Sequence, residues 1–258
     1  MARRPTAEEV DYAKRAASML LFPTSAWATG MVLFHRYCDY ISNQQPPDGD
    51  NDIIPSHLCI MLCLYLAAKA TEEPRKQRDI INVGYKLDNP ESEFLPVDER
   101  MYALCNTMTQ AELVLIRVLG FNVNVDLPHS WIASILYGMT WWEQKGIPPD
   151  DTELVDIQVK NIARLAWLIA DNVVIAGLVD REPVQAMAAA CILIALQVDG
   201  IPLPAKNLTE WADVWARSSA SRVERVQRLI EDNVNIDKCK QERDSSIRSN
   251  RDLSYDSQ

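Results

Sequence analysis

The histidines are the side chains of this chain best suited to acid–base or metal chemistry, and they are His35, His57 and His129. None belongs to an HExxH pair, and the 8 glycines are scattered rather than gathered into a phosphate-binding loop. No GxSxG nucleophile motif occurs in the chain. The sequence therefore predicts no catalytic residue, no cofactor and no enzyme activity of its own.

The six cysteines could in principle bind a metal, but none forms a CxxC pair. Most of them sit inside apolar stretches, which is typical of buried free thiols. We therefore expect no metal site. The cysteines are Cys38, Cys59, Cys63, Cys105, Cys191 and Cys239.

A group of charged residues follows directly on an unbroken apolar run. The eleven residues from Leu58 to Ala68 are apolar, and they are succeeded by Lys69, Glu72, Glu73 and Arg75. A lysine offers three donors on a flexible stem and a carboxylate offers only acceptors, so such residues suit charge-assisted hydrogen bonds. Lys69 also has a local explanation, because a cation at a helix C-terminus is stabilised by the macrodipole.

Glu112 lies about forty residues further on, in a second apolar segment. Thr109 and Glu112 have the spacing of a capping box, so Glu112 could serve only its own helix. The residues from Met101 to Met108 already have a helical pattern, which argues against a helix start at Thr109.

The composition limits the class of protein. The chain has 258 residues, 48% of them hydrophobic, which suits one large domain or two of ordinary size with a proper core. Its net charge of −10 opposes general binding to nucleic acid or to anionic membrane. The apolar runs are too short to span a bilayer. We expect a soluble intracellular protein with no direct nucleic-acid, membrane or small-molecule ligand.

Prolines break helices, so the 14 prolines outline the elements between them. The intervals carry apolar residues at three- and four-residue spacing, and no strand is convincing. Thr6 with Glu9 and Ser221 with Glu224 fit capping boxes. The predicted fold class is all-α, with helices near 7–21, 25–42, 56–70, 76–87, 98–119, 129–143, 152–177, 183–198, 207–216 and 219–233. The segment 44–51 is predicted to be an exposed loop.

These helices divide into two groups of five with the same pattern. The third helix of the second group also contains eleven apolar residues, from Ala186 to Leu196. A helix that is apolar on every side is buried on every side, so each group should wrap four helices around its third. The expected domains are residues 1–124 and 125–236, followed by a polar tail, 237–258, expected to be disordered.

Several motifs resemble the cyclin box. They include Ala67 to Pro74 and Arg78 to Val83 in the first half, Pro128-His129, and Ala195 to Pro202 in the second half. The likeness covers roughly residues 7–235 and is greatest to transcription-type cyclins (the cyclin K, L, T and Q group), among them cyclin Q most. It implies two tandem five-helix cyclin boxes.

The resemblance also implies a partner and a set of contact residues. In that family a lysine at the end of the third helix and a glutamate in the fifth bind the regulatory helix of a cyclin-dependent protein kinase; Lys69 and Glu112 match them. The same implication extends to Glu72, Glu73 and Arg75, which could instead belong to a solvated loop. Apolar contact is expected from exposed parts of the third to fifth helices, namely Ile80, Leu113 and Ile116.

The function implied is that of a regulatory subunit, which forms a heterodimer with a transcription-linked kinase and activates it. The kinase-ten type is favoured, and the location implied is nuclear, with the cytoplasm as a second compartment. Two alternatives stay open: a TFIIB-like cyclin-fold transcription adaptor, and a scaffold that binds a kinase without activating it. The adaptor would need a basic face and usually a zinc ribbon. The net charge of −10 argues against it.

Overall fold

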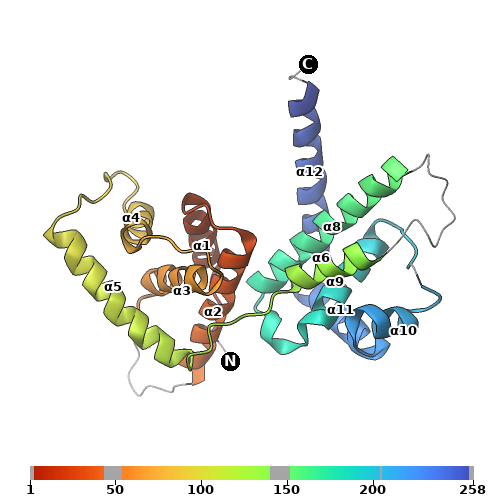
Figure 1. Cartoon of the computed structure of the whole chain (residues 1–258), viewed down its shortest axis with the longest axis horizontal. Helices are drawn as coiled ribbons and strands as arrows, with labels where there is room; N and C mark the ends of the chain where they lie inside the picture. The colour runs from red at the N-terminus through yellow and green to blue at the C-terminus, as the bar shows by residue number, and fades with distance from the viewer. Residues whose placement is uncertain (1–2, 44–53, 140–151, 204, 256–258) are drawn as a thin grey trace. The chain divides into compact units, whose positions relative to one another are not determined.

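The computed structural model describes residues 3–43, 54–139, 152–203 and 205–255 (Figure 1). Every regular element in these ranges is helical, so the all-α prediction is confirmed there. The chain divides into two compact units, Met1–Val125 and Asp126–Gln258. The predicted loop at 44–51 and the tryptophan pair Trp141-Trp142 lie outside the described residues.

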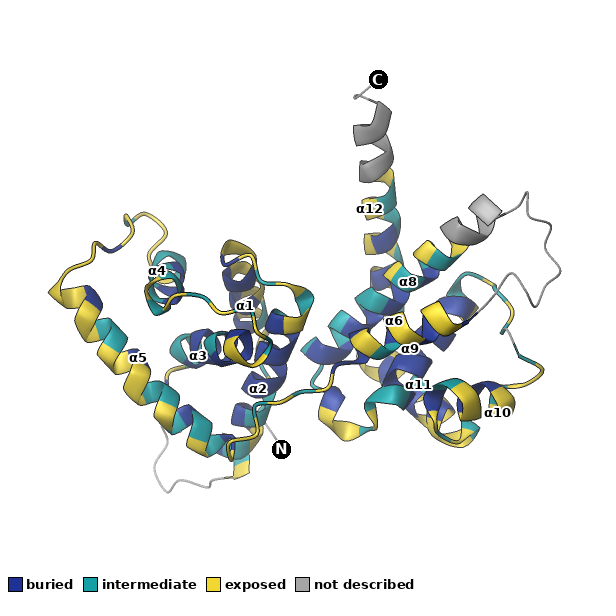
Figure 2. Cartoon of the chain, in the orientation of Figure 1, coloured by how far each residue is buried: buried dark blue, intermediate teal, exposed yellow. Residues whose placement is uncertain are grey.

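The first unit is built around α3. This helix contacts each of the other four helices of the unit. All of its apolar run is buried except Leu58 and Tyr65, which are half-buried (Figure 2). The helices of the unit are α1 (Ala7–Met19), α2 (Thr24–Asn43), α3 (Ser56–Ala70), α4 (Gln77–Asp88) and α5 (Glu99–Val118).

A glycine lets α2 approach α3 closely. A Cβ atom at Gly30 would lie 2.8 Å from Leu64 Cδ2 and 3.2 Å from Leu64 Cα. Real Cβ atoms do not come so near to carbon, so only glycine fits this crossing without displacing the central helix.

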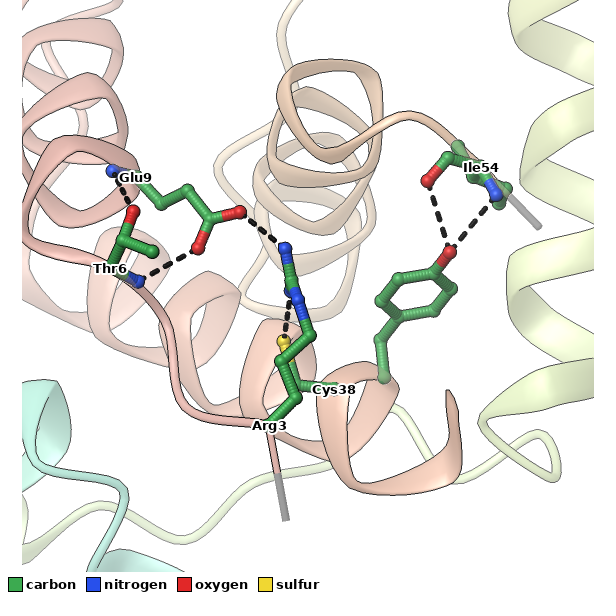
Figure 3. Close-up of polar contacts among 6 residues, drawn as sticks. Arg3, Thr6, Glu9, Cys38 and Ile54 are labelled. Atoms are coloured by element: carbon green, nitrogen blue, oxygen red, sulfur yellow. Dashed lines mark hydrogen bonds and ion pairs between the residues drawn. The ribbon is translucent and has the colours of Figure 1, made fainter. Parts of the chain in front are cut away.

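The N-terminal segment is tied to the first unit by a buried carboxylate (Figure 3). The predicted capping box is present, because Glu9 N–H donates to Thr6 Oγ1 and Thr6 N–H donates to Glu9 Oε2 at 2.8 Å. Glu9 Oε1 also accepts from Arg3 Nη2 at 2.6 Å, and Arg3 Nη1 donates to Cys38 Sγ at 2.9 Å. Burial alone raises the pKa of Glu9, but the Thr6 amide and the Arg3 guanidinium outweigh it and hold that pKa below its ordinary value.

The second unit repeats the arrangement around α9, whose run from Ala186 to Leu196 is buried at every position. The prediction of a second capping box at Ser221 is wrong: α11 begins at Ala220, and its cap is Ser219, whose side chain accepts from Arg222 N–H. Trp211 is fully buried. The helices are α6 (Pro128–Gly138), α8 (Thr152–Ile175), α9 (Val184–Val198), α10 (Leu208–Trp211) and α11 (Ala220–Asn233), with a 3-10 turn at Val179–Arg181 and a π-helical turn at Ala212–Ala216.

The expected disordered tail is instead a helix, α12 (Ile236–Tyr255), which packs on α8. Among the residues of α12 up to 248, Cys239 and Arg243 are buried, one turn apart on the same side. Arg243 Nη1 donates to Asp199 Oδ2 at 2.6 Å, at the C-terminal end of α9. The expectation rested on the shortage of apolar residues, but the docking of α12 depends on an ion pair that composition does not reveal.

The burial of Glu9 predicts a pH-dependent contribution to stability. Because its pKa is depressed in the folded chain, this contribution is complete above the ordinary carboxyl pKa of about 4.5 and is lost as the pH falls through the lower folded value. The Glu9→Gln variant should therefore be less stable than wild type at pH 7, and the difference should shrink towards pH 3. Urea unfolding at both pH values measures it, and an equal difference at both would contradict the assignment.

The ion pair that docks α12 predicts that substitution of Arg243 lowers stability. Arg243→Ala should lower the stability of the second unit by about 1–3 kcal/mol, because it leaves the Asp199 carboxylate unpaired at a partly buried site. Amide hydrogen exchange in α12 should speed up accordingly. Lys238→Ala is the control, since Lys238 makes only an exposed pair with Glu242 at 3.8 Å, and it should stay within about 0.5 kcal/mol of wild type.

Candidate functional site

The end of α3 places the predicted charged residues at the surface. Glu73 N–H donates to Ala68 O at 2.8 Å and Glu72 N–H to Lys69 O at 3.4 Å, which is a Schellman motif. Glu72 occupies its left-handed position with a φ of +59°. The chain therefore turns away sharply just after the helix and leaves Lys69 exposed in the last turn.

Lys69 and Glu112 meet in the structure. Lys69 Nζ lies 2.5 Å from Glu112 Oε1, and it also lies 3.9 Å from the centre of the Tyr65 ring. The Lys69 side chain is 42% exposed and that of Glu112 is 14% exposed. A lysine has three donors and a carboxylate has several acceptor positions, so the pair keeps free hydrogen-bonding capacity for a partner.

Glu112 is not a helix cap. The helix α5 begins at Glu99, with Asp98 accepting from Met101 N–H as its cap. Thr109 therefore lies in the middle of α5, where its hydroxyl donates to Cys105 O at 2.9 Å. The purely local explanation of Glu112 is wrong.

The apolar residues predicted beside this pair divide into two groups. Leu113 is 48% exposed and Ile116 is half-buried on α5, which has only three buried residues among those described. Ile80, by contrast, is fully buried, so its expected place on the exposed surface is wrong. It lies on the inward stripe of α4 with Val83 and Gly84, three and four residues later.

Arg75 is occupied within the fold. Its Nε and Nη2 atoms donate to the carbonyls of Leu20 and Leu21 at 3.0 Å, and its guanidinium lies 5.2 Å from the Phe22 ring centre. Those carbonyls follow the end of α1, where backbone acceptors lack helical partners. Arg75 thus fastens the α1–α2 turn to the end of α3. Glu73 lies beside it, with 3.7 Å between Glu73 Oε2 and Arg75 Nη1.

Phe121, just beyond the end of α5, is an exposed aromatic residue that the sequence reasoning missed. Its N–H donates to Ile116 O at 2.9 Å in the Schellman motif that ends α5. An apolar residue at this place usually packs back on its helix, yet Phe121 is 73% exposed. Gly120, at the helix end, was the sequence signal that could have indicated this motif. Lys69, Glu112, Leu113, Ile116 and Phe121 are called the α3–α5 face below.

Two of the histidines lie against carboxylates. His57 Nδ1 lies 2.8 Å from Asp88 Oδ1, and His129 Nε2 lies 3.0 Å from Asp171 Oδ1. His57 also stacks on Tyr12 and lines a cavity of about 220 Å³ between α3, α4 and α5. Among the described residues no cluster of metal-ligating side chains occurs, and no helix is long and apolar enough to cross a membrane.

Comparisons with known proteins give relatives and a structural neighbour. No family model matches the chain. It is 28% identical over 205 residues to mouse Cyclin-L2 and to chicken Cyclin-L1, covering 76% of this chain. The chain spans about a third of the length of these relatives. In the solved structure of the yeast RNA Pol II CTD kinase CTDK-1 complex, one chain matches with a TM-score of 0.59 at 16% identity, over 86% of this chain and 64% of that chain.

These similarities support the transcription-type cyclin family. The predicted cyclin fold is confirmed by the structural neighbour.

The conformation of Glu72 predicts a gain in stability on substitution. A left-handed φ costs a residue with a side chain about 1 kcal/mol relative to glycine. Glu72→Gly should therefore raise the free energy of unfolding by about that amount, measured by urea denaturation. Glu73→Gly, next in the chain and without positive φ, is the control and should destabilise or have no effect. A destabilised Glu72→Gly variant would mean that its carboxylate makes contacts that outweigh the strain.

Proposed function

We propose that this chain binds a transcription-linked cyclin-dependent kinase through the α3–α5 face and activates it. The observation that carries the proposal is the pairing of Lys69 with Glu112, which come from two helices and meet at a partly exposed position. The cyclin relatives and the cyclin fold support a role of this class.

The pair has the chemistry to hold the end of a partner helix. Backbone carbonyls and amides at a helix terminus lack helical partners. The remaining donors of Lys69 can bond such carbonyls, and the remaining acceptor positions of Glu112 can bond such amides, as charge-assisted hydrogen bonds. The partner element proposed is the regulatory helix of the kinase, whose position controls the catalytic Lys–Glu pair.

The apolar part of the α3–α5 face has to supply most of the energy. Shifting a kinase from 1:99 to 99:1 in favour of its active arrangement takes about 5.5 kcal/mol of differential affinity. An exposed ion pair contributes about 0–1 kcal/mol. Burial of Leu113, Ile116 and Phe121 by the partner can provide the rest, because buried apolar anchors dominate interface energies.

The cyclin subtype that we propose is cyclin Q, with a kinase-ten partner in the nucleus. This subtype rests on the sequence motifs. Two other functions compete with activation. A scaffold would use the same face without changing the kinase. A TFIIB-like adaptor would need a basic surface for nucleic acid, and the charge of −10 makes it the weaker candidate.

Substitution of the central pair tests the proposal. Lys69→Ala and Glu112→Ala should each lower kinase activation at a fixed, subsaturating chain concentration by about tenfold, since each leaves one charge unpaired in the interface. The measurement is a pull-down against a panel of purified cyclin-dependent kinases, followed by a kinase assay with the captured enzyme.

Arg225→Ala is a matched control. Arg225 pairs with Glu182 at 2.7 Å in the second unit, with exposed fractions of 62% and 16%. It should leave activation unchanged. Wild-type activation by both Lys69→Ala and Glu112→Ala would refute their roles, and capture of a kinase without activation would establish the scaffold instead.

A further inference from the structure

The connection between α4 and α5 exposes several large apolar side chains within nine residues. Phe94 is 59% exposed, Val97 is 61% exposed, and Tyr102, in the first turns of α5, is 62% exposed. Single exposed apolar residues are ordinary on a protein surface, but a local group of them marks an interaction site. These three residues are called the 94–102 patch.

The connection is held in place by polar contacts from α4. Lys86 Nζ donates to the carbonyls of Pro90 and Ser92 at 2.6 and 2.8 Å. Leu95 N–H donates to Asn82 Oδ1 at 2.8 Å, and the Leu95 side chain is buried. The loop is therefore fixed on both sides of Phe94, which is presented outward from an ordered backbone. Presentation by an ordered loop lowers the entropy lost on binding.

Local helix packing accounts for only part of the patch. Val97 and Tyr102 occupy the positions just before the Asp98 cap and in the first turns of α5, where a hydrophobic staple forms. A staple explains why both are apolar. It does not explain Phe94, or why the pair stays about three-fifths exposed.

Acidic residues flank the patch in the sequence. The segment 91–100 contains four acids and one arginine. The arginine, Arg100, lies 5.2 Å from the Tyr85 ring centre. Glu91, Glu93 and Glu99 are exposed. A surface of this kind complements an apolar site bordered by basic side chains.

Part of the patch lies on the same side of α5 as the apolar residues of the α3–α5 face. Tyr102 precedes Leu113 by eleven residues and Ile116 by fourteen, close to three and four helical turns, so these side chains share one side of α5. A partner lying along α5 would therefore meet both surfaces, about 16 Å apart at a rise of 1.5 Å per residue.

We propose that the 94–102 patch is a second anchor for the same kinase, received by an apolar surface that basic side chains border. The inference rests on the proposed function and extends it. The Lys69–Glu112 pair holds one end of α5 against the partner, and the patch holds the other end.

The test is the double variant Phe94→Ser/Val97→Ser in the full chain. Both side chains are largely exposed, so the thermal midpoint should stay close to that of wild type. Its affinity for the kinase that wild type captures, measured by titration calorimetry, should fall about tenfold or more. Tyr137→Ser is the control, because Tyr137 is 91% exposed and lies in the second unit; its affinity should equal that of wild type.

A charge variant gives an independent readout. Glu91→Gln/Glu93→Gln should bind more weakly at low salt, and its affinity should depend less on ionic strength than that of wild type, because screening acts on exposed charge pairs. A salt dependence equal to that of wild type would overturn the proposal that basic side chains border the partner's apolar surface.

The outcomes separate the two proposals. Wild-type affinity of Phe94→Ser/Val97→Ser, together with weakened binding by Glu112→Ala, would overturn the second anchor and leave the proposed function standing. Failure of the wild-type chain to bind any kinase of the panel would overturn both.

Discussion

The burial of the apolar run of α3, complete except at Leu58 and Tyr65, is the constraint on which the rest of the first unit depends. A helix that is apolar on all sides cannot face water on any side, so four other helices must surround it. The surrounding helices can then be only partly apolar, because each has one side on α3 and one side in solvent. The constraint also fixes where the apolar run must stop. It stops at Lys69, and the first charged residue after the core lies at the boundary between α3, α5 and solvent.

The second unit obeys the same constraint but uses the end of its central helix differently. Lys69 and Gln197 both lie two residues before the helix cap, as the matching Schellman bonds show. Where Lys69 meets a carboxylate of α5, Gln197 Oε1 accepts from Gln227 Nε2 of α11 at 2.8 Å. The neighbouring Asp199 binds Arg243 and so holds α12. The end of α3 thus carries a partly exposed ion pair, whereas the end of α9 carries a bond between two glutamines and a largely buried ion pair that holds α12. This difference favours the first unit as the docking unit.

Much of this architecture follows from the sequence because its signals are local. Proline positions and apolar spacing predicted the elements from α1 to α6 and from α8 to α11, and the two apolar runs identified α3 and α9 as the buried helices. The errors arise where an outcome depends on a distant group. Ile80 faces inward because of the rotation of α4 against α3, and Arg75 binds carbonyls of Leu20 and Leu21, more than fifty residues earlier in the chain. The helix α12 was missed because its docking depends on Asp199, forty-four residues away.

The candidate site shows why a sequence can suggest which residues lie there but not whether their side chains are already held in place. Fixing a free lysine side chain costs up to about 2 kcal/mol of conformational entropy. Lys69 is already confined by the Tyr65 ring on one side and Glu112 on the other, so part of this cost is met before a partner arrives. Phe121 is likewise fixed at the end of α5 by its backbone bond to Ile116, although its side chain finds no core to enter. A surface whose charged and apolar groups are held in place while remaining exposed fits the proposed association with a partner, because the folded unit gains little from leaving these groups in water.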